Sequence, residues 1–251
     1  MVSLYELGLE ERDRVNPAFG GGFPKGSIVL LEGSHGAGKS VFAQRFCYGL
    51  CESDTYVTYV SAELTAGSLI KQMGSMDYDI VDHLLREQLL FLHADVDTRD
   101  TINQRPGPEE AGGRELITKL MQAETMWESD VVIFDGFDAI LLHDPHYEAI
   151  SEHGDADDIM QNMITYFRQI VNQDKTLILT VNPDSLSRTA LRPLRNAADV
   201  YLSLEMESVG SEVRRNIVVK KFAEMGNQVD DNIGYAVQSG RGITIVTRTV
   251  A

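Results

Sequence analysis

Short runs of consecutive apolar residues alternate along this chain with segments whose apolar residues recur every three or four positions. The runs predict strands buried on both faces, because such strands need apolar side chains at successive positions. They cover residues 27–32, 56–62, 89–93, 131–135 and 176–181. Strands that alternate with helices in this way predict an α/β fold with a mostly parallel central sheet flanked by helices.

The segments between these strands have the periodicity of amphipathic helices. Phe42, Phe46 and Leu50 fall on one face of the first helix, and Thr65 is the expected N-terminal cap of the second. The predicted helices cover residues 39–51, 65–76, 116–127 and 160–171. Each helix therefore has an apolar face that can cover the sheet.

The last third of the chain predicts strands without intervening helices. These strands cover residues 200–206, 217–222, 235–238 and 243–247, and the last two flank the turn residues 239–242. We expect this segment to extend the sheet at one edge as a C-terminal β extension.

Length and composition predict a single domain over residues 1–251, with a lead-in over 1–19 and an exposed loop, rich in Gly, Pro and charge, over 97–113. The apolar runs are too short to cross a bilayer, so we expect a cytoplasmic protein without direct membrane insertion. The net charge of −16 disfavours a general affinity for nucleic acid, because nucleic acids are polyanions.

A glycine-rich loop follows the first predicted strand and opens the first predicted helix, which is the arrangement of a phosphate-binding loop. Glycines allow backbone N–H groups to turn inward around phosphate oxygens. Lys39 would neutralise the β- and γ-phosphates, and the Ser40 hydroxyl would bind Mg²⁺. The sequence thus predicts that ATP and Mg²⁺ are bound by Gly33, Ser34, His35, Gly36, Ala37, Gly38, Lys39 and Ser40.

Polar residues at the ends of other predicted strands complete the expected site. Asp135 ends a strand of the Walker B type, whose carboxylate holds Mg²⁺ through water. Because Gly136 follows it, the candidate for orienting the attacking water is Glu63, after the second strand. Asn182 is a candidate sensor of the γ-phosphate, although Asn-Pro is also an ordinary turn signal.

These segments together resemble the KaiC branch of the RecA superfamily of P-loop ATPases, and the likeness runs from about Phe19 to the C-terminus. It rests on residues 20–26, 33–40, 59–63 and 131–135. Within that branch, the length of the chain and residues 180–183 and 218–222 look most like the FlaH or ArlH family of accessory ATPases of the archaeal flagellum, the archaellum.

The resemblance implies a nucleotide-dependent homo-oligomeric ring at the cytoplasmic face of the cell membrane. It also implies contacts with the motor ATPase FlaI and with membrane-associated motor components, and a regulatory role for ATP. The KaiC clock protein has two adjacent glutamates where this chain has Glu63 and Leu64, and a Lys-x-Arg pair where this chain has Lys220-Lys221-Phe222. Loss of that arginine predicts weak or absent hydrolysis, so whether the protein acts as an enzyme stays open.

Two other functions use the same core. A DNA recombination or repair ATPase would place DNA-binding loops after the strands that end near Asp135 and Asn182. The first of these loops is acidic, whereas the second holds Arg188, Arg192 and Arg195. A KaiC-like autokinase would need the same phosphate loop and carboxylates as an ATPase, so the sequence does not separate these two activities.

The large excess of acidic residues predicts that concentrated salt stabilises the fold. At about 1 M salt, charges are screened over roughly 3 Å, which removes most of the repulsion among surface carboxylates. We expect the melting temperature to rise between about 0.1 and 2 M KCl at constant pH, which thermal denaturation followed by circular dichroism measures. A steady fall over this range would contradict the prediction.

Overall fold

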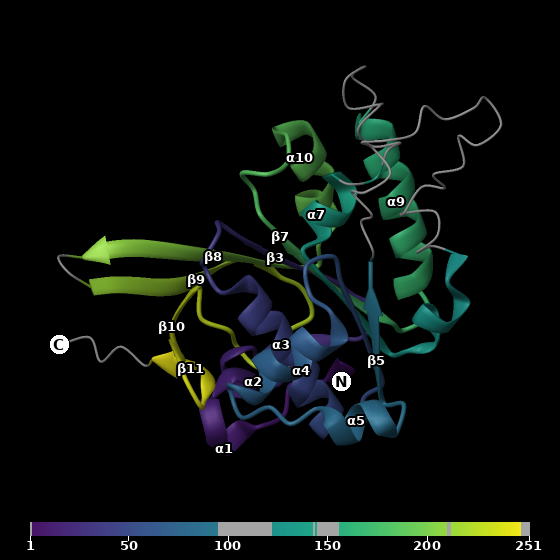
Figure 1. Cartoon of the computed structure of the whole chain (residues 1–251). Helices are drawn as coiled ribbons and strands as arrows, with labels where there is room; N and C mark the ends of the chain where they lie inside the picture. Colours follow the sequence, from purple (N-terminus) through teal and green to yellow (C-terminus); the bar gives the residue numbers. More distant parts are fainter. Residues whose placement is uncertain (1, 95–121, 143, 145–155, 210–211, 247–251) are drawn as a thin grey trace, which may run out of the picture.

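One nine-stranded sheet organises the computed structural model, which describes residues 2–94, 122–142, 144, 156–209 and 212–246 (Figure 1). The strand order is β11-β10-β9-β8-β3-β7-β6-β4-β5. Six strands pair in parallel: β3 (Ile28–Gly33), β4 (Val57–Ser61), β5 (Leu89–His93), β6 (Val131–Asp135), β7 (Thr176–Val181) and β8 (Val200–Val209). The antiparallel strands β9 (Glu212–Phe222), β10 (Asn232–Gln238) and β11 (Gly242–Val246) extend one edge.

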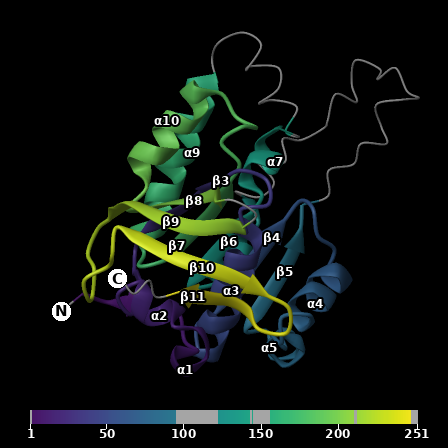
Figure 2. The same ribbon diagram turned by 90° about the vertical axis from the view of Figure 1, so that its left-hand side faces the viewer.

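Helices cover both faces of this sheet, as Figure 2 shows. One face carries α3 (Lys39–Glu52), α4 (Ala66–Gly74) and α5 (Val81–Leu85), together with the short helices α1 (Glu10–Asp13) and α2 (Val15–Ala18). The other carries α7 (Phe137–Leu142), α9 (Ala156–Val171) and α10 (Arg188–Ala197). Within the described residues, none of the helices combines the length and the apolarity needed to span a bilayer.

The predicted mostly parallel α/β fold and its C-terminal β extension are confirmed. The strands predicted over 89–93, 131–135 and 176–181 have the same bounds in the structure. The side chains of β6 and β7 are buried because helices lie on both sides, which is why their sequence is mostly apolar, whereas only Leu89 is buried in the edge strand β5. Thr65 caps α4 as predicted, since its side chain accepts a hydrogen bond from Ser68 N.

Two predictions in the connecting segments were wrong. The segment with Arg188, Arg192 and Arg195, interpreted above as a loop, is the helix α10; Ser187 caps it, and Ala190, Leu191 and Leu194 are buried. Arg195 pairs with Glu32 of β3 instead of being free for a nucleic acid. Pro193 lies inside the helix and masked its pattern.

The helix predicted over 116–127 extends too far, which is the second of these errors: Gln122 is helical, but the residues that follow form a 3₁₀ helix, η1 (Glu124–Glu128). Residues 116–121 of that prediction lie outside the described residues, as does the loop predicted over 97–113.

The N-terminal lead-in is part of the core, which its sequence did not indicate. Its first strand, β1 (Leu4–Tyr5), pairs with β2 (Phe23–Pro24). Arg45 of α3 is fully buried and forms an ion pair with the fully buried Asp13 of the lead-in. The same guanidinium donates to the Leu7 and Gly8 carbonyls, at 2.6 and 2.9 Å. The helix that follows the phosphate loop is thereby tied to the start of the chain.

Asp13→Asn is expected to lower the free energy of unfolding by about 3–5 kcal/mol, because it leaves the buried Arg45 charge without its ionic partner. Urea denaturation measures this loss. The control is Asp82→Asn, which breaks an exposed i,i+4 pair with Arg86 and is expected to change little. Equal effects of the two substitutions would show that the buried pair does not hold the lead-in.

Candidate nucleotide-binding site

The phosphate loop connects β3 to α3 at the carboxyl end of the parallel strands. Gly36 and Gly38 have φ values of +80° and +97°, in the left-handed region that side chains disfavour. Residues in this conformation turn neighbouring N–H groups toward one side, which forms an anion-binding nest. The first N–H groups of α3 also lack acceptors within the helix, so the loop and the helix start offer several donors to one anion.

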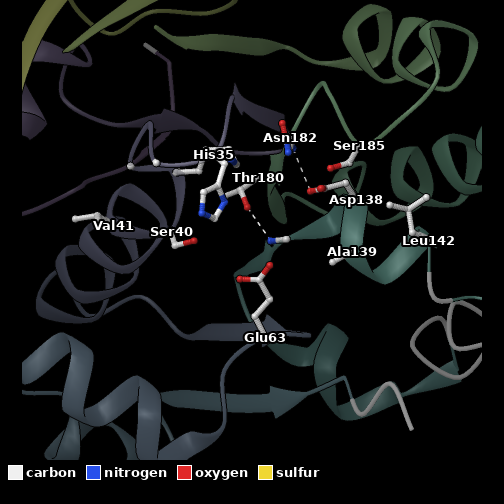
Figure 3. Close-up of a pocket in the computed structure, with 14 residues that line it drawn as sticks. His35, Ser40, Val41, Glu63, Asp138, Ala139, Leu142, Thr180, Asn182 and Ser185 are labelled. Atoms are coloured by element: carbon white, nitrogen blue, oxygen red, sulfur yellow. Dashed lines mark hydrogen bonds between the residues drawn. The ribbon is translucent and has the colours of Figure 1, made fainter. Parts of the chain in front are cut away.

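A cavity of about 480 Å³ opens over this loop, within the size range of small-molecule sites (Figure 3). Residues from three strand ends and two helices line it: His35, Gly36, Gly38, Lys39, Ser40, Val41, Glu63, Gly136, Asp138, Ala139, Leu142, Thr180, Asn182 and Ser185. Of the eight predicted loop residues, Gly33, Ser34 and Ala37 are not among the lining residues. Their carbonyls accept hydrogen bonds within the site: those of Gly33 and Ser34 from Lys39, and that of Ala37 from Tyr235.

Lys39 folds back over the loop. Its ammonium donates to the carbonyls of Gly33 and Ser34, at 2.8 and 3.2 Å. Burial lowers the pKa of Lys39, and the nearby carboxylates of Asp138, Asp135 and Glu63 oppose that shift. Neutral carbonyls are weaker partners for an ammonium than phosphate oxygens, so the charge is available to a phosphate that enters the cavity.

The Asp135 carboxylate lies behind the cavity and is held at both oxygens. Tyr59 Oη donates to Oδ2 at 2.8 Å, and Thr180 Oγ1 donates to Oδ1 at 3.0 Å. The Ser40 side chain lies near this carboxyl. Burial raises the pKa of Asp135, and the hydrogen bonds from Tyr59, Ser40 and Thr180 oppose the shift. A serine hydroxyl beside a buried carboxylate is a donor set that fits Mg²⁺.

The remaining two candidates reach the same cavity from the ends of β4 and β7, the two strands that flank β6. Glu63 lies two residues beyond β4, and Figure 3 shows its carboxylate pointing into the cavity. Asn182 follows β7; its backbone N donates to Asp138 Oδ1 at 3.1 Å, and its side-chain oxygen accepts from Asp184 N at 3.2 Å. The side-chain NH₂ of Asn182 is therefore the group that can donate a hydrogen bond to a phosphate oxygen.

Four residues that support the site were missed by the sequence interpretation. Tyr59 and Thr180 interrupt apolar strands with a hydroxyl, which was the available signal, but only the strand register shows that both face Asp135. Asp138 lies at the start of α7. Tyr235 comes from the C-terminal extension, and its hydroxyl donates to the Ala37 carbonyl of the phosphate loop.

Comparison with known proteins agrees with this geometry. The family described as "ATPase: KaiC" matches residues 8–250 of the chain. The "Archaeal flagellar ATP-binding protein FlaH" of Methanocaldococcus jannaschii is 30% identical over 240 residues, which are 96% of this chain and 95% of the relative. The chain belongs to the FlaH family of KaiC-like ATPases.

A further FlaH protein and two solved structures are also similar to this chain. FlaH of Methanococcus voltae is 26% identical over 96% of both chains. The crystal structure of the M. jannaschii FlaH superimposes with a TM-score of 0.83 and 29% identity, covering 98% of this chain and all of the other. The KaiC-like protein PH0186 of Pyrococcus horikoshii OT3, at 20% identity and a TM-score of 0.73, shares the fold.

Lys39→Met is expected to weaken ATP binding by roughly 100-fold, or about 2.7 kcal/mol, because charge-assisted hydrogen bonds to phosphate are lost. Isothermal titration calorimetry with ATP measures the effect. The matched control is Lys175→Met: Lys175 also donates to two carbonyls, but it precedes β7 at the opposite end of the sheet. An unchanged ATP affinity in Lys39→Met would show that this loop does not bind the phosphates.

Proposed function

We propose that this FlaH-family chain is an ATP- and Mg²⁺-binding regulatory component of the archaellum motor complex. ATP binding assembles a homo-oligomeric ring at the cytoplasmic face of the cell membrane, where the ring contacts the motor ATPase FlaI and membrane-associated motor components. Hydrolysis is slow or absent. In this role the nucleotide acts as an assembly signal, and the motor ATPase supplies the mechanical work.

The observation that carries the proposal is the convergence of Lys39, Asp135 and Glu63 around one phosphate-loop cavity. The three side chains match the needs of a bound magnesium nucleotide, namely a cation for the phosphates, a carboxylate behind the metal and a carboxylate near the γ-phosphate. The names of the relatives, which describe archaeal flagellar ATP-binding proteins, support the cellular setting.

The scarcity of cationic side chains around the cavity supports weak hydrolysis. Among the described lining residues, Lys39 is the only lysine or arginine. The late-strand lysines are engaged within their own chain, since Lys220 pairs with Glu205 and Lys221 donates to the Ala198 carbonyl. An arginine finger can raise the rate of phosphoryl transfer by a thousandfold or more, so a site without one is expected to hold ATP for long periods.

Assembly into a ring is supported by the shape of the C-terminal extension. Strands β8 and β9 project beyond the rest of the sheet as a two-stranded arm (Figure 1). Met206 and Val213 lie on one face of this arm and are 39% and 54% exposed. Apolar side chains on a projecting ribbon favour docking against another surface, for which we propose a second copy of this chain.

The proposal predicts that Mg·ATP converts the wild-type protein into a particle of several copies. Size-exclusion chromatography with light scattering measures the mass, and a parallel assay measures released phosphate. We expect Lys39→Met to stay small and Lys175→Met to assemble like wild type. Phosphate release is expected below roughly one per minute, the range of P-loop proteins without an arginine finger. A monomer that turns ATP over rapidly would contradict the proposal.

A further inference from the structure

Tyr59 occupies a position in β4 where a strand buried on both faces would ordinarily carry an aliphatic side chain. It is fully buried, and its ring stacks on Phe91 of β5 with centroids 6.3 Å apart. Its hydroxyl donates to Oδ2 of Asp135 at 2.8 Å. Because Thr180 holds the other oxygen, the carboxylate is fixed in rotation as well as in position.

A second buried polar side chain stands behind this hydroxyl. Gln44 of α3 is fully buried near the Tyr59 hydroxyl, where its amide opposes the rise that burial causes in the pKa of Tyr59. Its Nε2 also donates to Oε1 of Gln72 on α4, at 2.9 Å. A tyrosine hydroxyl has a single proton to donate. Asp135 Oδ2 is the acceptor of that proton, and the Gln44 side chain lies near the phenolic oxygen.

Burying the Gln44 amide destabilises the fold, and packing alone does not explain why an amide lies there. Within the described part of the chain, Gln44 Oε1 is buried and has no hydrogen-bond partner. A buried unpaired acceptor destabilises a fold, and an apolar side chain of similar volume would avoid the penalty. The polar row that runs from Gln72 through Gln44 and Tyr59 ends on the Asp135 carboxylate, which lies behind the cavity.

We propose that Tyr59, held from behind by Gln44, is a positioning residue for the Mg²⁺ of the bound nucleotide. It acts through Asp135: the hydroxyl keeps Oδ2 in the orientation in which the carboxylate receives the water ligands of the metal. This inference rests on the proposed function, because it assumes that Mg²⁺ and ATP occupy the cavity. It assigns Tyr59 no contact with the nucleotide itself.

The test is Tyr59→Phe, which keeps the ring on Phe91 and removes only the hydroxyl. ATP affinity is measured by calorimetry in EDTA and across a series of Mg²⁺ concentrations. We expect the Mg²⁺ concentration for half-maximal enhancement to rise roughly tenfold, the usual effect of losing a hydrogen-bond partner of a metal ligand. ATP affinity in EDTA is expected to stay within about twofold of wild type, because the phosphate loop is unchanged.

The matched control is Tyr78→Phe. Tyr78 is also fully buried, and its hydroxyl accepts a hydrogen bond from Ile243 N, away from the cavity. This variant is expected to keep the wild-type Mg²⁺ dependence. A general packing defect in Tyr59→Phe would weaken ATP binding with and without Mg²⁺, and that result would overturn the positioning role.

A second variant keeps the test decisive if Tyr59→Phe does not fold. Gln44→Leu preserves volume and removes the group that orients the Tyr59 proton, so we expect the same shift in Mg²⁺ dependence, in smaller measure. Wild-type Mg²⁺ dependence in the folded variants would overturn the inference and leave the proposed function standing. ATP binding that ignores Mg²⁺ in the wild-type protein would overturn both.

Discussion

Parallel pairing of β3, β7, β6 and β4 is the constraint on which the site depends. Because these strands run in the same direction, their carboxyl ends meet at one edge of the sheet, and the residues that follow them converge. The register sets Ser61 opposite Asp135 and Leu31 opposite Thr180. The phosphate loop, Asp135, Glu63 and Asn182 come together for this reason, although they are far apart in the sequence.

Burial shifts the pKa values of the two central charged side chains at this edge in opposite directions. It raises the pKa of Asp135 and lowers the pKa of Lys39, so in both cases the charged form is disfavoured. Hydroxyl groups partly compensate the carboxylate, and the loop carbonyls partly compensate the ammonium. A magnesium nucleotide would supply the missing partners together, a phosphate for Lys39 and a metal for Asp135. The proposed function therefore includes a preference for the magnesium complex over free ATP.

Local patterns made much of the fold and of the phosphate loop predictable from the sequence. The buried strands were recognisable because helices on both faces require apolar residues throughout, as at residues 131–135. The loop was recognisable because its glycines and Lys39 are contiguous. Asp135 and Glu63 were proposed because the first ends a predicted strand, the second follows one, and parallel strand ends converge.

Features that depend on distant partners could not be read in this way. The contacts of Tyr59 and Thr180 with Asp135 require the register of the completed sheet. The ion pair between Asp13 and Arg45 requires the packing of the lead-in against α3. The helix α10 escaped notice because Pro193 and several arginines outweighed its few apolar residues. In each case tertiary packing, which a single sequence does not display, decided the outcome.

The central claim is that this cavity binds a magnesium nucleotide through the phosphate loop. A crystal structure with Mg²⁺ and a non-hydrolysable ATP analogue tests it most directly. The account predicts phosphates against the amides of residues 36–40, Lys39 Nζ moved from the Gly33 and Ser34 carbonyls onto phosphate oxygens, and the metal beside Ser40 with Asp135 behind it. A nucleotide bound elsewhere, or Lys39 still on its own loop in the complex, would contradict it.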